Sequence, residues 1–190
     1  MRRRVAGAAA IAILAGLTAG WAQAGGFQTV SCKGFPVTYG GMADKQDCSE
    51  AEIETTRAKR LVVRASTYLL LATYYDSGSH HYFALQPLDK LAAESGLFVS
   101  PRKISDGSGG NGYAVSVFVG ELADRTGEAA CAFFSKYYGK AGGEAVGAVD
   151  GQGYKFMVQG FYCPQGRKEL KWKEFYPEIQ QALARIHAPA

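Results

Sequence analysis

The sequence predicts an α+β domain in which an antiparallel sheet is packed by a long central helix and a C-terminal helix and is held by two disulfides. Three observations lead to this prediction. A helix N-terminal motif at Ser49 precedes a long apolar stretch, residues 113–119 alternate in the manner of a strand, and the cysteines number four. With 190 residues, 47% of them hydrophobic and 20% charged, the chain suits a single folded domain rather than a disordered one.

The first 24 residues have the features of a secretory signal peptide. Three arginines at 2–4 precede an apolar and small-residue stretch at 5–20, and Ala22 and Ala24 form a small-x-small cleavage motif. We therefore expect cleavage after Ala24 and a secreted or periplasmic domain over 25–190. The alternative is an uncleaved anchor, because 5–21 is just long enough to span a bilayer. No later apolar run is long enough, so we expect no membrane span in the mature chain.

Removing this segment also removes most of the net charge. Without the arginines at 2–4, the 21 basic residues become 18, against 17 acidic ones. A nearly neutral mature chain lacks the broad positive surface that nucleic-acid binding requires, so we expect no nucleic-acid partner.

All four cysteines lie in the mature chain, where an even number in an exported protein predicts disulfides. Three pairings are possible. We favour Cys32–Cys48 and Cys131–Cys163, because each pair encloses a short, turn-rich segment in a different half of the chain. Zinc is the competing interpretation, but no two cysteines have C-x₂₋₄-C spacing, so we predict no metal site and no free catalytic thiol.

The long central helix is predicted over 50–75. Ser49 and Glu52 form a capping box, and further acidic residues in the first turns suit the positive end of the helix dipole. Residues 61–75 are apolar almost all round, which is typical of a fully buried helix, although several are β-branched and lower the helical propensity. Asp76 begins the polar stretch that ends the helix.

The remaining elements are shorter. A short helix is predicted at 87–95, a polar glycine-rich loop at 100–112, a central strand at 113–119 and a second helix at 128–138. Short extended pieces are predicted at 27–30, 36–39, 81–85 and 97–99, a hairpin over 145–149 and 154–162, and a C-terminal helix over 167–187 that is broken or kinked at Pro177.

No complete cofactor motif is present. Gly107, Gly109 and Gly112 fit G-x-G-x-x-G, but that motif needs a strand before it and a helix after it, and here a strand follows. We therefore expect no cofactor.

Three residues are candidates for a catalytic cleft. Glu121 and Asp124 follow the strand 113–119, where a sheet can hold two acids over a cleft, as glycosidases require at separations of about 5–9 Å. His81 is a candidate general base. The alternative is that these residues are solvated, as most charged residues are.

Two basic clusters are candidates for binding. Arg57, Arg60 and Arg64 have the 3–4 spacing of one helix face, which would suit an anionic partner. Lys168 and Lys171 lie beside Trp172, a mixture of cations and aromatic rings that suits a stacked ligand or partner. The alternatives are an ordinary solvated helix face and core aromatics.

These observations favour binding over catalysis. A reaction needs a constellation of groups, and the sequence contains only isolated members of one. We expect an exported, non-catalytic binding or interaction domain of the cell envelope or extracellular space, with a macromolecular partner there. The alternative is a small exported hydrolase that acts on a cell-wall or other polymer. The sequence indicates neither the ligand nor the oligomeric state.

Overall fold

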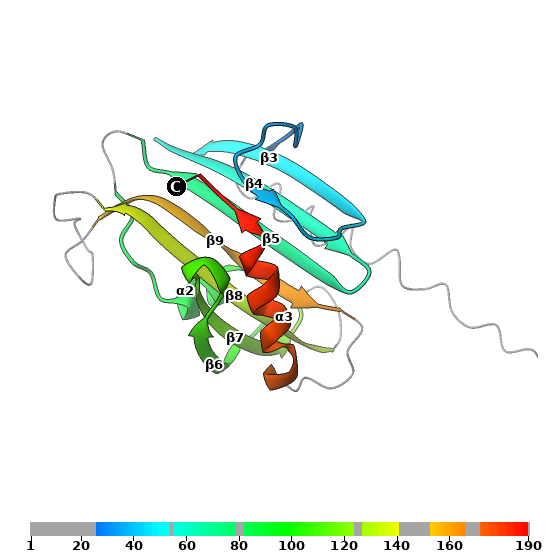
Figure 1. The fold of residues 1–190 in the computed structure, drawn as a ribbon. Helices are drawn as coiled ribbons and strands as arrows, with labels where there is room; N and C mark the ends of the chain where they lie inside the picture. Colours follow the sequence, from blue (N-terminus) through cyan, green and yellow to red (C-terminus); the bar gives the residue numbers. More distant parts are fainter. Residues whose placement is uncertain are drawn as a thin grey trace, which may run out of the picture.

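The chain folds around an antiparallel sheet of eight strands in the order β1-β3-β4-β5-β9-β8-β7-β6 (Figure 1). The computed structural model describes residues 26–53, 55–78, 82–123, 127–140, 153–165 and 172–189. The strands of the sheet are β1 (Gln28–Val30), β3 (Lys45–Ile53), β4 (Thr56–Ala65), β5 (Tyr68–Asp76), β6 (Arg102–Ser108), β7 (Ala114–Glu121), β8 (Glu128–Lys140) and β9 (Tyr154–Pro164). The other elements are β2 (Thr38–Tyr39), α2 (Leu88–Glu94), the 3₁₀ turn η1 (Gly110–Gly112), α3 (Trp172–Ala184) and β10 (Ile186–His187).

Two meanders build the sheet. Strands β3, β4 and β5 form one, strands β6 to β9 form the other, and they join where β5 pairs with β9. The sheet edges are poorly suited to pairing with another chain, because β1 has three residues and β6 carries a bulge between Lys103 and Ser105.

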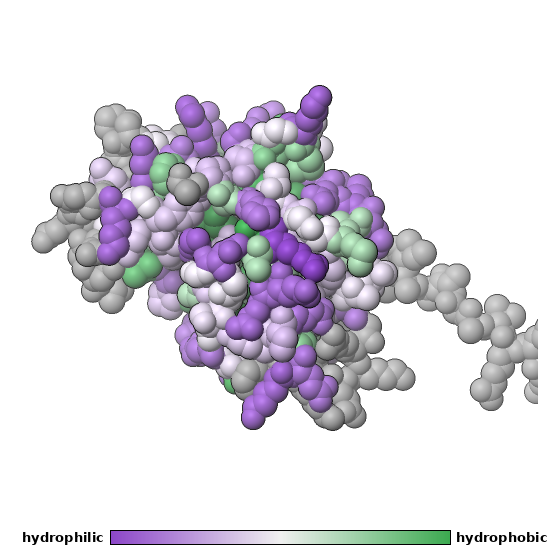
Figure 2. Space-filling view, in the orientation of Figure 1, coloured by the Kyte–Doolittle hydropathy of each residue, from purple (hydrophilic) through white to green (hydrophobic). Residues whose placement is uncertain are grey.

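The first face of the sheet, here called the α3 face, carries Leu61, Leu70, Phe134 and Val158. Helix α3 crosses this face, and the chain ends on the same side (Figure 1). Its residues at 175, 179 and 183 are buried, with a spacing of one helical turn, while hydrophilic side chains cover its outward side (Figure 2). The loop between β1 and β3 covers the rest of the face with Phe35, Val37 and Tyr39.

The opposite face, here called the α2 face, carries Val62, Leu71, Phe133 and Phe161. Ala92 of α2 and the following Leu97 and Phe98 pack against it. Because both faces are covered, the central strands are buried on both sides, and their sequences are nearly continuous runs of apolar residues.

The long central helix predicted over 50–75 is wrong. This stretch forms the end of β3, all of β4 and nearly all of β5, with Ser66 and Thr67 as the turn between the last two strands. Ser49 and Glu52, expected to cap the helix, lie within β3. The apolar pattern came from two adjacent strands with both faces buried, which hydrophobic periodicity alone cannot distinguish from a buried helix. The protein is mainly antiparallel sheet rather than a sheet packed by a long central helix.

The helix predicted at 128–138 is also wrong, because these residues lie in β8. Successive side chains there alternate between the two faces: Ala132 and Phe134 contact the α3 face core, and Cys131 and Phe133 contact the α2 face core.

Several shorter predictions are corrected in part. The predicted loop 100–112 contains β6 and η1, and the extended pieces near 83 and 98 are single bridges, Phe83 with Tyr154 and Phe98 with Leu122. Helix α3 is shorter than predicted and continues through Pro177, and β10 replaces its expected end. Residues 145–149 and 167–171 lie outside the described residues.

Other predictions are confirmed. The strand predicted at 113–119 is β7, and the short helix predicted at 87–95 is α2. Both predicted disulfides are present, with Cα–Cα distances of 5.2 Å for Cys32–Cys48 and 4.3 Å for Cys131–Cys163. No helix in the described ranges is long and apolar enough to cross a membrane.

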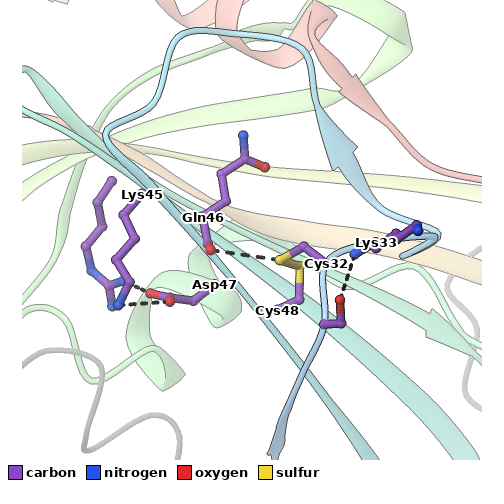
Figure 3. Close-up of a disulfide and its surroundings, with 8 residues drawn as sticks. Cys32, Lys33, Lys45, Gln46, Asp47 and Cys48 are labelled. Atoms are coloured by element: carbon purple, nitrogen blue, oxygen red, sulfur yellow. Dashed lines mark hydrogen bonds and ion pairs between the residues drawn. A yellow bond between two sulfur atoms is a disulfide. The ribbon is translucent and has the colours of Figure 1, made fainter.

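The two disulfides join different kinds of structure. Cys131 and Cys163 lie opposite each other on neighbouring strands, because Ala132 pairs with Tyr162. Cys32 lies in the loop after β1 and is tied to Cys48 in β3, with its Sγ 3.9 Å from the Gln46 carbonyl oxygen (Figure 3). The two bridges are consistent with an oxidising extracellular or periplasmic location.

Candidate ligand-binding site

The glycine-rich segment that ends β6 is where α3 approaches the sheet most closely. A Cβ on Gly110 would lie 2.7 Å from Ala184 Cβ and 2.8 Å from the Gln180 carbonyl oxygen. A Cβ on Gly109 would lie 2.4 Å from a Leu183 methyl carbon. These glycines therefore serve packing, and they let the last turn of α3 rest directly on η1.

Asn111, between these glycines and β7, connects three parts of the site. It is the one non-glycine residue with positive φ among the described residues, at φ 61°, a conformation that asparagine tolerates better than most residues. Its side-chain Nδ2 donates hydrogen bonds to the carbonyl oxygens of Ala184, at 2.9 Å, and Ile186, at 3.5 Å. The first bond satisfies a carbonyl group that the end of α3 leaves without an intrahelical partner, and the second reaches the start of β10.

The backbone carbonyl oxygen of Asn111 accepts a hydrogen bond from a lysine. Lys136, on the α3 face of β8, donates a hydrogen bond from Nζ to that oxygen at 2.7 Å. The same Nζ lies 5.7 Å from the centroid of the Tyr113 ring, within the range of a cation–π contact. These two contacts hold the ammonium group in position, and within the described residues it forms no ion pair with a carboxylate.

Lys136 lines a pocket of about 500 Å³ between the sheet and the end of the chain. One wall comes from the sheet and η1, and the other from the last residues after α3. The lining residues are Asn111, Tyr113, Lys136, Tyr138, Gly139, Ile186, His187, Ala188 and Pro189. The volume falls within the range of about 300–1,000 Å³ typical of small-molecule sites.

The electrostatics of the pocket are positive. None of the lining residues in the described ranges is acidic, whereas Lys136 carries a positive charge and His187 adds an imidazole. Burial raises the pKa of Tyr113 to about 12, and burial also raises the pKa of Tyr138, assisted by Tyr74 and Tyr113. Both phenols therefore stay neutral at physiological pH and contribute aromatic surface without negative charge.

The chain-end wall is held by pairing with the N-terminal loop. Ile186 pairs with Tyr39 and His187 with Thr38, and the amide of Gly40 donates to the Arg185 carbonyl at 3.0 Å. The loop that supplies β2 is tied back to the sheet by Cys32–Cys48. The pocket is thus preformed by segments from both ends of the chain.

The three arginines predicted to share a helix face lie on a strand and are divided between its two sides. In β4, Arg57 is opposite Glu52 and faces the α3 side, whereas Arg60 and Arg64 face the α2 side. Arg64 forms an ion pair with Asp47, and burial lowers the pKa of Arg60, whose guanidinium lies 3.6 Å from the Phe27 ring centroid. The predicted single arginine surface is therefore absent from β4.

Of the other predicted site residues, the structure describes Glu121, and it does not line this pocket. Glu121 is exposed at the far end of β7 from Tyr113, opposite Glu128. Four of them lie outside the described residues: His81, Asp124, Lys168 and Lys171. Trp172 is the first residue of α3. Within the described ranges, no group of three or more His, Cys, Asp or Glu residues is placed to hold a metal ion.

A second hollow, of about 570 Å³, lies beside β1 and the β3–β4 pair. It is lined by charges of both signs, with Glu50 and Glu52 near Arg57 and Lys59. Lys59 and Glu50 form an ion pair at 3.4 Å, so these charges satisfy each other. This hollow lacks the apolar walls and net charge of the pocket at Lys136.

Sequence analysis missed Lys136 and Asn111. Lys136 lay within a stretch interpreted as a helix, and Asn111 within a loop. The available indication was the run Gly110-Asn111-Gly112, because asparagine between two glycines favours a left-handed turn.

Comparison of the chain with known protein families, curated proteins and solved structures finds no match.

Proposed function

We propose that the protein is an exported binding domain that takes a small, partly apolar organic molecule into the pocket between β8 and the end of the chain. One observation carries this proposal: the pocket is preformed, with aromatic and aliphatic walls and a lysine that two contacts hold in place. Apolar walls with a few fixed polar groups are typical of ligand sites.

Export is part of the same proposal. The arginine-led apolar segment at 2–20 and the small-residue motif ending at Ala24 support removal of a signal peptide. The two disulfides support an oxidising destination. The intact mass of the exported protein tests this directly, since cleavage after Ala24 leaves residues 25–190.

The binding proposal is tested with the neutral fluorescent probe N-phenyl-1-naphthylamine, titrated into the exported protein. We expect saturable binding with one site per chain. The variant Ala188→Trp fills the pocket from its chain-end wall and should abolish binding, and Pro189→Trp provides a second variant of the same kind. Ala123→Trp is the matched control, because residue 123 is exposed and does not line the pocket.

Thermal unfolding of each variant shows whether it is folded at the temperature of the titration. Absence of saturable binding by the unsubstituted protein would overturn the proposal. So would unchanged binding by both pocket-filling variants.

A further inference from the structure

We propose that the ligand of this pocket is a monocarboxylic acid with an apolar body, and that Lys136 binds its carboxylate. This inference rests on the proposed function and names the chemical class that the site accepts. Three features carry it: the charge of the pocket, the number of donors that remain on Lys136, and the composition of the walls.

The charge of the pocket selects an anion. Lys136 is half-buried, and within the described part of the chain no carboxylate pairs with it. A buried or half-buried charge is normally compensated by an opposite charge. Because none of the lining residues that the structure describes is acidic, an anionic ligand would supply that compensation.

The donors on Lys136 suit a carboxylate. An ammonium group has three N–H donors, and the Asn111 carbonyl uses one of them. The remaining two can reach the two oxygens of one carboxylate, and a hydrogen bond between ionised groups is about twice as strong as a neutral one.

The end of α3 argues against a doubly charged group such as a phosphate monoester. The Ala184 carbonyl, which receives the Asn111 side chain, lies at the negative end of the α3 helix dipole. This end disfavours a dianion more than a monoanion, because the repulsion grows with the charge of the ligand.

The walls select an apolar body. Ile186, Ala188 and Pro189 form the chain-end wall, and the rings of Tyr113 and Tyr138 lie on the sheet side. Each CH₂ group buried in such surroundings contributes about 0.8 kcal/mol. The pocket volume of about 500 Å³ is large enough for such a body.

Displacement of N-phenyl-1-naphthylamine from the unsubstituted protein tests the carboxylate. Octanoate is compared with octan-1-ol and octyl phosphate, and 3-phenylpropanoate with 3-phenylpropan-1-ol. We expect at least one acid to displace the probe at a concentration about tenfold lower than its alcohol, because of the charge-assisted contact with Lys136. The two acids distinguish an aliphatic from an aromatic body, and octyl phosphate should displace no better than octanoate.

Substitution then assigns the preference to Lys136. In Lys136→Gln the acid and its alcohol should displace the neutral probe equally, whereas Lys136→Arg should restore a preference for the acid. Lys155→Gln is the matched control, since Lys155 is exposed on β9 and does not line the pocket.

Equal displacement by acids and alcohols from the unsubstituted protein would overturn the carboxylate proposal, as would octyl phosphate displacing tenfold better than octanoate. An unchanged acid preference in Lys136→Gln would also overturn it. In each of these cases the probe still binds, so the proposed function stands. Failure of the probe itself to bind would instead overturn the proposed function.

Discussion

Two tyrosine hydroxyl groups on the α3 face differ in one respect that can be measured. The Tyr138 hydroxyl is buried and has no hydrogen-bond partner among the described residues. The Tyr162 hydroxyl donates to the Glu178 carboxylate. A buried polar group without a partner destabilises the fold by about 1–3 kcal/mol, whereas a hydrogen bond to a charged group stabilises it by about 1.5–3 kcal/mol.

We therefore expect Tyr138→Phe to stabilise the protein by about 1 kcal/mol, because it removes the unsatisfied hydroxyl and keeps the ring. For a chain of this size that corresponds to a rise in Tm of about 2–4 °C. Tyr162→Phe is the matched control and should lower Tm, since it leaves Glu178 without this donor. Calorimetry on both variants checks the prediction, and an equal fall in Tm for both would show that the Tyr138 hydroxyl is satisfied.

At the scale of elements, the contact between η1 and α3 depends on the absence of a side chain at Gly110. An added methyl group there would overlap Ala184 and the Gln180 carbonyl, neither of which can rotate away. We expect Gly110→Ala to destabilise the protein by about 1–3 kcal/mol, the usual effect of overpacking. It should also weaken probe binding, because Asn111 and the pocket wall would move.

Gly40→Ala is the control for this prediction. A Cβ at Gly40 would lie 3.7 Å from His187 Nε2, an ordinary contact, so the change should be nearly neutral. Urea unfolding of both variants measures the difference in the free energy of unfolding. Equal values would show that α3 does not need the close approach at Gly110.

The sequence predicted elements well where the pattern was local. The strand β7, the helix α2 and both disulfides followed from alternation, from Pro and Gly at the helix ends, and from cysteine spacing. The pair β4 and β5 was mistaken for one helix, because both faces are buried and the turn at Ser66 and Thr67 contains neither Gly nor Asn.

The candidate site could be predicted less well, because its parts come from distant positions. Lys136, Asn111 and Ile186 become neighbours only when β8, η1 and the end of the chain meet. Spacing along one segment predicted an arginine face that the strand β4 then divided between two sides. Residue patterns predict local structure, whereas this pocket is a product of long-range packing.

At the scale of the whole molecule, the chain-end wall of the pocket pairs with the N-terminal loop, and the two disulfides make different contributions to it. Cys131–Cys163 connects two strands in the middle of the sheet and packs on the α2 face, opposite the face that carries the pocket. Cys32–Cys48 anchors the loop whose strand β2 pairs with β10, the element that leads into that wall.

We therefore expect removal of one disulfide to affect mainly stability and removal of the other to affect mainly probe binding. Their sequence separations are 16 residues for Cys32–Cys48 and 32 for Cys131–Cys163. The chain-entropy model assigns them about 3 and about 4 kcal/mol of stabilisation, respectively. The double variant Cys131→Ala/Cys163→Ala should lose more stability, and it also loses packing at a fully buried position, yet it should bind the probe with unchanged affinity while folded.

Cys32→Ala/Cys48→Ala should lose less stability but bind the probe about fivefold more weakly, a difference of about 1 kcal/mol, because the chain-end wall loses its anchor. Urea unfolding and probe titration on the two double variants give both quantities. Equal probe affinity in the two variants would mean that the β2–β10 pairing holds the wall without the disulfide. If only the Cys131→Ala/Cys163→Ala variant bound the probe more weakly, the disulfide in the centre of the sheet, and not the one that anchors the N-terminal loop, would maintain the pocket.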